Sequence, residues 1–284
     1  MQAPLSRTLD GVQEQRNLAW RELAVRMEGV LAEQNRASCE AMQRLDPTTG
    51  ASALAIGSGQ ALFMGSGSPL TQALAMGLSG PPKEGEIEAI EAHLGRAGGP
   101  VQFELCPLAA PELFAALAAR GYRVQELQLC WHLSLGAAPE EPRVPGLEIR
   151  RLLPGEEDAA LRASLGGFLE CAPGAVPESL VGMLRPALLA PGSVVFGAFE
   201  DCTMIGSGVL FVHRGTASIA GAGVLPGHRG RGAQGAMIRA RLAAAWRAGG
   251  TLVTSSTAPN SASQRNMERH GFRVAYPKVV LVKG

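Results

Sequence analysis

Residues 224 to 235 read Val224-Leu225-Pro226-Gly227-His228-Arg229-Gly230-Arg231-Gly232-Ala233-Gln234-Gly235. An apolar run over 216–225 leads into this stretch and predicts a strand, and the periodic segment 237–248 after it predicts a helix. No acidic residue occurs between Gly215 and Gly250. Because glycines let backbone N–H groups converge and a helix N-terminus carries partial positive charge, the stretch predicts a phosphate or pyrophosphate site. The alternative is an ordinary glycine-rich turn between a strand and a helix.

Two familiar nucleotide-binding loops do not fit this spacing. The Walker sequence Gly-x-x-x-x-Gly-Lys-Ser/Thr is absent, which excludes that triphosphate loop. The segment from Gly230 to Gly235 does spell Gly-x-Gly-x-x-Gly, but a dinucleotide loop also needs an acidic residue about 20 residues further on. The next acidic residue is Glu268, which is too distant. The sequence therefore argues against a dinucleotide-binding fold.

Two motifs together resemble the GCN5-related N-acetyltransferase (GNAT) family. That family carries Arg/Gln-x-x-Gly-x-Gly/Ala after its fourth strand, and residues 229–234 take that place, with Gln234 where the family prefers Gly or Ala. The second motif, Asn260-Ser261-Ala262-Ser263-Gln264-Arg265 and then Gly271-Phe272, is similar to the pattern at the family's penultimate helix and last strand. Two motifs in this order are more specific than either one. The resemblance covers 147–283.

The resemblance implies an α/β (α+β) fold of the acyl-CoA N-acyltransferase type, with a mixed, mostly antiparallel sheet and flanking helices. It also implies acetyl-CoA (coenzyme A) as the donor, held in a V-shaped gap between the strands 216–225 and 251–256. The pantetheine arm would pair with the backbone of Gly223, Val224 and Leu225. The pyrophosphate would bind the N–H groups of Arg229, Gly230, Arg231, Gly232, Ala233, Gln234 and Gly235. Asn260 would lie near the donor arm; as an alternative or in addition, it would cap a helix.

The sequence leaves the catalytic groups unknown. Many family members place a Tyr four residues before the Gly-Phe pair as the acid, and here that position is Met267. Tyr276 is a weak substitute that we interpret as structural. The other groups in reach of the predicted gap, or able to titrate near neutrality, are Ser255, Ser256, His213, His228 and His270. An unassisted hydroxyl is a poor base, so we assign no base; a water-relayed proton path is an alternative.

Charge divides between the two halves of the chain. Residues 1–145 carry 11 Lys/Arg against 16 Asp/Glu, and residues 146–284 carry 15 against 9. An anionic ligand is therefore expected in the second half. Nucleic-acid binding is a poor hypothesis, because aromatic residues make up only 5% of the chain and do not alternate with clustered cations.

Other sequence features argue against several classes of protein. The five cysteines form no Cys-x-x-Cys pair, which argues against a disulfide framework and against a metal site. The chain has no apolar run of about 18 residues and no basic leader before an apolar run. We therefore expect no membrane partner and a cytoplasmic protein, either a monomer or a homodimer.

A segment rich in proline and glycine divides the chain. Residues 136–146 contain three prolines and two glycines, which predicts a linker between domains at 1–135 and 147–284. The first part is expected to hold a helix over 11–46, possibly interrupted, strands at 52–56, 60–64, 70–78, 101–105 and 122–135, and helices at 87–94 and 111–120. The second is expected to hold strands at 147–152, 193–199, 203–212, 251–256 and 272–282, and helices at 156–169, 177–184 and 261–270.

The two parts share an internal repeat. Gly98-Gly99, followed by Gly121-Tyr122-Arg123-Val124, matches Gly249-Gly250, followed by Gly271-Phe272-Arg273-Val274. The first part lacks the Arg-Gly-Arg-Gly loop and carries Lys83, Glu84 and Glu86 there, whose carboxylates would repel a phosphate. We infer a degenerate GNAT-like copy in the N-terminal half, with anion binding kept only in the second. A chance match is the alternative.

These observations lead to three hypotheses of function. The first is an N-acetyltransferase that moves an acetyl group from acetyl-CoA to the amine of a small-molecule or peptide acceptor, by direct attack. The second is a non-catalytic coenzyme A-binding or sensor module, suggested by Met267 and by the missing base. The third is a phosphate-binding protein unrelated to coenzyme A. The acceptor is expected near the loop at 170–181, whose chemistry varies freely.

Overall fold

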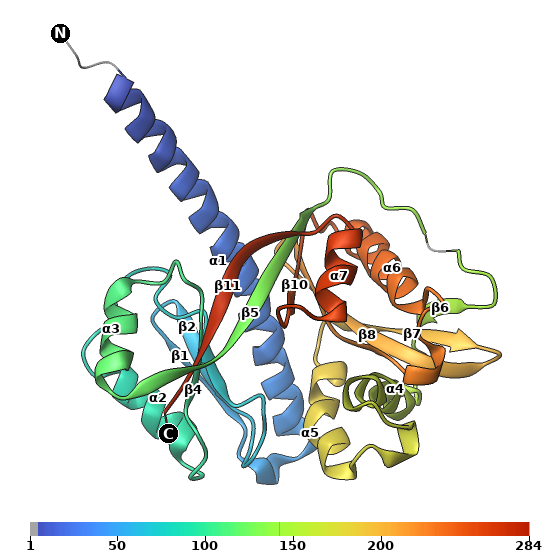
Figure 1. Cartoon of the computed structure of the whole chain (residues 1–284). Helices are drawn as coiled ribbons and strands as arrows, with labels where there is room; N and C mark the ends of the chain where they lie inside the picture. Colours follow the sequence, from blue (N-terminus) through green and yellow to red (C-terminus); the bar gives the residue numbers. More distant parts are fainter. Residues whose placement is uncertain (1–4, 142, 284) are drawn as a thin grey trace.

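A single sheet of eleven strands runs through the whole molecule (Figure 1). The computed structural model describes residues 5–141 and 143–283, with side chains from Leu18 onward. The helices are α1 Leu5–Leu45, α2 Glu86–Gly95, α3 Pro111–Ala119, α4 Glu157–Leu169, α5 Glu178–Leu189, α6 Ala233–Arg247 and α7 Ala262–Arg269. The strands are β1 Ser52–Ile56, β2 Gly59–Phe63, β3 Gln72–Leu74, β4 Gln102–Leu105, β5 Tyr122–Ser134, β6 Glu148–Arg151, β7 Ser193–Glu200, β8 Thr203–His213, β9 Thr216–Val224, β10 Leu252–Thr257 and β11 Arg273–Lys283.

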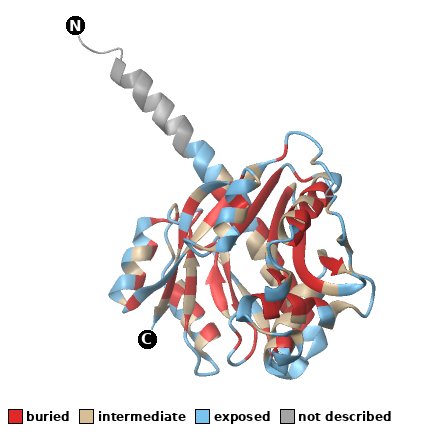
Figure 2. Ribbon diagram, turned by 45° about the vertical axis from the view of Figure 1, so that its right-hand side comes forward, coloured by how far each residue is buried: buried red, intermediate tan, exposed pale blue. Residues whose placement is uncertain are grey.

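The sheet is mixed and mostly antiparallel, which confirms the predicted fold class. Its strand order is β1-β2-β3-β4-β11-β5-β10-β9-β8-β7-β6. The parallel pairs are β3 with β4 and β9 with β10, and each is connected by a crossover that contains a helix, α2 or α6. Hairpins connect the antiparallel neighbours β1–β2, β7–β8 and β8–β9. Helices cover both faces of the sheet, whose strands form the buried interior (Figure 2).

The order of elements repeats between the two halves. The series β1-β2-β3-α2-β4-α3-β5 has the same sequence of elements as β7-β8-β9-α6-β10-α7-β11. The repeated glycines also occupy matching conformations: Gly98 and Gly249 have φ of 72° and 78°, and Gly121 and Gly271 have φ of 85° and 80°. Only glycine adopts such left-handed conformations without strain. The structure therefore supports a second, GNAT-like copy in the N-terminal half.

The last strand of each half lies against the other half. β11 lies between β4 and β5, and β5 in turn lies between β11 and β10 (Figure 1). β5 pairs with β11 from Tyr122 to His132, with bulges near Ala275 and near the 280–281 step. The predicted division at 136–146 falls in a connection that forms no helix or strand in its described residues. The domain boundaries remain a prediction, because the two halves share these strands.

Helix α1 is continuous over 41 residues, so the possible interruption does not occur. It crosses the sheet and contacts both halves (Figure 1). Arg26 donates to the Thr216 hydroxyl at 3.2 Å, at the start of β9. Glu28, fully buried, lies 3.0 Å from Nζ of Lys278 on β11 and accepts a hydrogen bond from the Tyr276 hydroxyl at 2.7 Å. A buried charge is tolerated when it is paired in this way.

Among the described residues, no helix is long and apolar enough to cross a membrane. The five cysteines are all free thiols, and three of them are buried. Burial raises the pKa of the Cys39 thiol to about 11. Within the same part of the chain, no group of three or more His, Cys, Asp or Glu side chains is arranged to hold a metal ion.

Candidate active site

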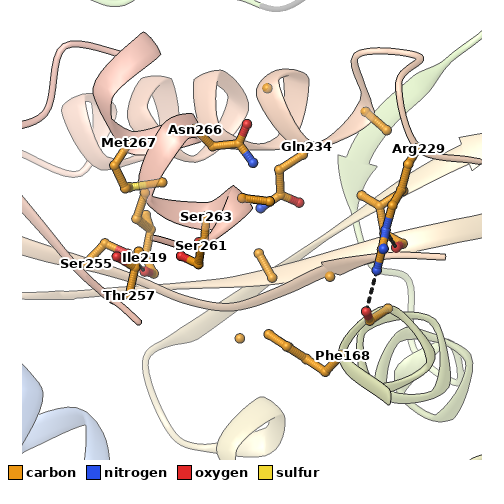
Figure 3. A pocket seen from close by; sticks show the side chains of 18 of the residues that line it. Phe168, Ile219, Arg229, Gln234, Ser255, Thr257, Ser261, Ser263, Asn266 and Met267 are labelled. Atoms are coloured by element: carbon orange, nitrogen blue, oxygen red, sulfur yellow. Dashed lines mark hydrogen bonds between the residues drawn. The ribbon is translucent and has the colours of Figure 1, made fainter. Parts of the chain in front are cut away.

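The parallel strands β9 and β10 are hydrogen-bonded to each other over only part of their length. β9 and β10 pair at only three positions, the last of which is Ser218 opposite Thr254. Beyond this point β9 continues to Val224 and β10 to Thr257 without pairing with each other, which opens the V-shaped gap that the family resemblance implied. A cavity of about 810 Å³ lies in the opening, lined by both strands and by the N-terminal ends of α6 and α7 (Figure 3).

Glycines allow helix α4 to pack directly on β9 beside this cavity. A Cβ atom on Gly223 would lie 2.2 Å from the backbone oxygen of Ser164, and one on Gly167 would lie 2.8 Å from the backbone of Val224. Neither position tolerates a side chain. The pairing of β9 with β8 also shifts register between Ser207 and Val209. The close packing therefore fixes the backbone of β9 along one wall of the cavity.

The N-terminus of α6 opens onto the same cavity. Gly230 and Gly232 have φ of 77° and 88°, the left-handed region that glycine favours. Gly232 is the N-cap residue, and no side chain caps the helix there. The helix begins at Ala233, four residues earlier than predicted, so its first turn lies within the loop motif. The first N–H groups of a helix lack intrahelical partners, and the helix dipole makes this end electropositive.

Carboxylates from distant parts of the chain bind the loop arginines. Arg229 pairs with Glu170 at 2.7 Å and also donates to the backbone oxygens of Gly167 and Val224 (Figure 3). Arg231 pairs with Glu200 at 2.6 Å, and its hydrogen bond lowers the pKa of that carboxyl group. Both loop arginines are therefore paired with carboxylates, although residues 215–250 contain no acidic residue. Both partners come from segments that precede the loop by more than 25 residues.

The structure brings most of the predicted donor-site residues to the cavity. The predicted residues that line it are Gly223, Val224, Arg229, Gly230, Gly232, Ala233, Gln234 and Gly235. Leu225, Arg231 and Asn260 lie outside the lining. Leu225 is buried instead, and Arg231 turns to Glu200.

The alternative role of Asn260 as a helix cap is wrong. Ser261 is the N-cap of α7, and its hydroxyl accepts from the N–H of Gln264 at 3.1 Å. Asn260 adopts a left-handed conformation with φ of 57°, which Asn tolerates better than most residues, and it is exposed. Its own N–H donates to the side-chain oxygen of Gln264 at 2.7 Å.

Polar side chains of α7 face the cavity opposite the α6 terminus. Ser261, Ser263 and Asn266 line it, and Gln234 extends toward them (Figure 3). The side-chain oxygen of Gln234 is buried without a hydrogen-bond partner among the described residues. The sequence interpretation missed Ser263 and Asn266. The three- to four-residue spacing of Ser263, Asn266 and His270 on a predicted helix is the signal that would have revealed this face.

The catalytic candidates differ in their access to the cavity. Ser255 is buried and donates to the backbone oxygen of Ile219 at 2.9 Å, whereas Ser256 is exposed in the cavity. Met267, at the position where the family resemblance implies a tyrosine, is 3% exposed and packs in the core. Tyr276 lies outside the lining, where burial and Glu28 raise the pKa of its hydroxyl group. This buried position outside the cavity agrees with the prediction that Tyr276 has a structural rather than a catalytic role.

The three histidines also have defined partners or positions. His228 lines the cavity, and its Nδ1 lies 2.7 Å from the Glu200 carboxylate that also binds Arg231. His270 lines the cavity near Gly235, with Nδ1 2.8 Å from the backbone oxygen of Asn266. His213 ends β8 and lies outside the lining.

A second, smaller cavity of about 250 Å³ lies at the matching place in the N-terminal half. Here the helix is α2, whose N-cap is Gly85 with φ of 81°. The carboxylate of Glu86 accepts from the N–H of Lys83 at 2.9 Å. The first turn of α2 therefore carries the carboxylates of Glu86 and Glu88 at its electropositive end, in agreement with the acidic residues of the sequence.

Comparisons with known proteins agree with this geometry. Residues 166–272 match the model of the acetyltransferase (GNAT) family. No curated protein sequence matches the chain significantly. Solved structures with a similar fold include a GCN5-related N-acetyltransferase from Kribbella flavida, with a TM-score of 0.61 and 18% identity, covering 87% of this chain and 95% of that one.

Two further structures share the fold. A GCN5-related N-acetyltransferase from Sphaerobacter thermophilus has a TM-score of 0.52 and 22% identity, covering 70% of this chain and 65% of that one. A tandem GNAT protein from the clavulanic acid biosynthesis pathway has a TM-score of 0.56 and 18% identity, covering 80% and 78%. At these identities the structures show the fold alone. The residues that line the cavity all lie within 166–272, the segment that matches the GNAT family model.

Proposed function

We propose that this chain is an N-acetyltransferase that moves the acetyl group of acetyl-CoA to the amine of a small-molecule or peptide acceptor. GNAT acetyltransferases use acetyl-CoA as their donor. The observation that carries the proposal is the gap between β9 and β10, which opens directly in front of the uncapped N-terminus of α6. This arrangement combines a strand edge free to pair with an amide-containing arm and an anion site at the adjacent helix terminus.

The donor would lie along the cavity with its charged end at α6. Its pyrophosphate would accept from the N–H groups of the loop and first turn, where Gly230 and Gly232 let the backbone approach closely. Its pantetheine arm would pair with the unpaired edge of β9 at Gly223 and Val224. Gln234 and Asn266 offer side-chain amides to the same arm.

The arginines would assist binding as part of an ion network rather than as free cations. Arg229 is already bound by Glu170, and Arg231 by Glu200. An incoming pyrophosphate therefore competes with these carboxylates. The backbone N–H groups of the α6 terminus are the primary anion ligands in this proposal.

Transfer needs a deprotonated amine, stabilisation of the oxyanion that forms, and a proton for the departing thiolate. Backbone N–H groups where β9 leaves β10 are suited to the oxyanion. Ser256 is the exposed hydroxyl of β10 in the cavity, and Met267 excludes water without donating a proton.

The acceptor would enter on the side of Phe168, which is 60% exposed at the C-terminal end of α4 and lines the cavity (Figure 3).

The alternative is a coenzyme A-binding or sensor module without turnover. It is favoured by Met267, which stands where the family resemblance implies a tyrosine acid and cannot donate a proton. Binding of the donor is common to both functions, so only turnover separates them.

The test measures thiol release from acetyl-CoA in the presence of a panel of primary amines that includes polyamines, aminoglycosides, amino acids and peptides with free N-termini. Amine-dependent release of free coenzyme A, with acetylated amine detected by mass spectrometry, supports the transferase. Binding of acetyl-CoA without release for any amine supports the binding module. Displacement of bound acetyl-CoA by inorganic phosphate as effectively as by coenzyme A would contradict both, because a generic phosphate site ignores the pantetheine arm.

A further inference from the structure

Three buried polar groups without partners lie side by side across three strands. Within the described residues, Oγ of Ser218, Oγ1 of Thr254 and Nδ1 of His132 are buried and make no hydrogen bond. Ser218 pairs with Thr254 in the β9–β10 register, and Thr254 pairs with His132 in the β10–β5 register. Ser218 and Thr254 are both 0% exposed. The three groups therefore form one row at the apex of the gap.

The row faces helix α1 and continues toward the cavity. Side chains alternate along a strand, so Thr254 shares its face with Leu252, which packs against α1, and with Ser256, which lines the cavity. Ser218 shares its face with Thr216, the partner of Arg26 on α1. The His132 ring meets the Trp20 ring of α1 edge to face, with centroids 6.3 Å apart.

Buried polar groups in proteins are almost always satisfied by protein atoms or by ordered water. Side chains at paired positions on neighbouring strands have Cβ atoms about 4.5–5.5 Å apart, which suits hydroxyl groups that share a bridging water. One buried group without a partner carries little weight, but three at consecutive paired positions form a polar row whose groups all need a partner. Polar groups arranged in this way are the ligands that buried ordered water uses, two to four for each molecule.

We propose that Ser256, Thr254, Ser218 and His132 hold a chain of bound water that carries the acceptor's proton from the cavity to His132. This inference rests on the proposed transferase function and supplies the proton path that the catalytic candidates lack. His132 does not touch the substrate; it acts through water and hydroxyl groups. It belongs to β5, so the N-terminal half would complete the site of the C-terminal half.

The chemistry of the step balances with one proton released. The acceptor ammonium first gives one proton to the water chain, and the amine lone pair then attacks the thioester carbon. The C–N bond forms, the C–S bond breaks, and the sulfur leaves as thiolate. The second proton of the nitrogen neutralises the thiolate, so the products are an amide, a thiol and one proton. That proton passes from His132 to solvent.

The environment of His132 keeps its ring able to accept a proton at neutral pH. Burial lowers the pKa of His132, and the Arg273 guanidinium lowers it further. Arg273 is its register partner on β11, Thr254 is its neighbour on β10, and α1 contributes the uncharged Trp20 ring. The neutral form of His132 therefore predominates at neutral pH, because its pKa lies below the ordinary histidine value. The rate should fall as the pH falls through this lowered pKa, because the protonated ring accepts nothing.

The first test needs no substrate and asks whether the row holds water. If the hydroxyl groups are hydrogen-bonded to water, Thr254→Val and Ser218→Ala should each lower the midpoint of thermal unfolding by about 2–4 °C. Thr257→Val is the matched control, because its hydroxyl accepts from the Trp131 indole at 2.8 Å and its loss must destabilise. An unchanged or raised midpoint in Thr254→Val and Ser218→Ala would overturn the proposal, since dry unpaired hydroxyls are better replaced by apolar groups.

The second test measures thiol release from acetyl-CoA against pH with the fastest amine of the panel. His132→Gln should remove the acid limb and lower the plateau rate about 10- to 100-fold, with unchanged affinity for acetyl-CoA. Thr254→Val should lower the rate while His132 is intact. Ser134→Ala, an exposed position two residues along the same strand, should leave the profile unchanged. An unchanged rate and acid limb in His132→Gln would overturn the proton path. Absence of release by the unmodified protein would instead count against the transferase, and the unfolding midpoints would still decide whether water fills the row.

Discussion

At the scale of single residues, the site depends on positions where a side chain would not fit. Gly223 and Gly167 bring the backbone of β9 and helix α4 into direct contact. This contact fixes the strand edge that the proposed donor would pair with. Polar residues matter in a different way: Gln234 places an unpaired amide oxygen at the cavity, in a motif position where the family prefers a small residue.

We predict that Gly223→Ala destabilises the protein by about 1–3 kcal/mol, because the new methyl group would overlap the Ser164 backbone oxygen. It should also weaken acetyl-CoA binding by displacing β9. Gly227→Ala is the control, since a Cβ there meets nothing within 4 Å and its φ is not positive. Denaturant unfolding of both variants measures the difference. Equal stability of the two variants would show that α4 moves away from β9 without any loss in the free energy of unfolding.

At the scale of elements, the decisive feature is the exposed N-terminus of α6 and the ion pairs around it. Arg229 and Arg231 hold the loop against α4 and β7 through Glu170 and Glu200. These pairs are largely exposed, and exposed ion pairs contribute little to stability. Their main effect is on the charge that an incoming anion meets.

Replacing both arginines by glutamate should abolish acetyl-CoA binding without unfolding the protein. The change puts two carboxylates beside Glu170, Glu200 and the helix terminus, where they repel a pyrophosphate. Arg247→Glu is the control, because Arg247 lies at the far end of α6 and also forms an exposed ion pair, with Glu141. Calorimetry and circular dichroism measure the two effects. Unchanged affinity of the double variant would rule out the loop as the phosphate site.

The sequence predicted local elements well and tertiary contacts poorly. The strand, loop and helix around residues 216–247 followed from apolar periodicity and glycine spacing, although Ala233-Gln234-Gly235 gave no apolar signal for the early start of α6. The Ser261 cap was missed because Asn260 and Ser261 are both good capping residues. Glu170 and Glu200 were missed because only the folded chain brings them to the loop. The row of His132, Thr254 and Ser218 likewise depends on strand register.

At the scale of the whole molecule, two similar halves share one sheet and exchange their last strands. β11 completes the N-terminal half between β4 and β5, while β5 extends the C-terminal half beside β10. The buried group of Glu28, Glu104 and Lys278 joins α1, β4 and β11 across this junction. The halves are therefore similar in fold but not independent in structure.

We expect residues 147–284 alone not to fold into a stable monomer. Without the first half, β11 loses both neighbouring strands, and Lys278 loses both carboxylates that compensate its burial. Production together with residues 1–146 as a separate chain should restore a folded complex. Cooperative unfolding and a native-like circular dichroism spectrum of 147–284 alone would contradict the shared-sheet account.

We expect the protein to have one donor site, in the gap between β9 and β10. Calorimetric titration of the full chain with acetyl-CoA, beside inorganic phosphate and ATP, is the direct test. We predict binding of acetyl-CoA at a single site with micromolar affinity, and much weaker binding of phosphate and ATP. One site is expected because the matching helix terminus of the N-terminal half carries Glu86 and Glu88 in its first turn, and their carboxylates would repel a phosphate. Two equal sites, equal binding of all three ligands, or no binding of acetyl-CoA would contradict the account.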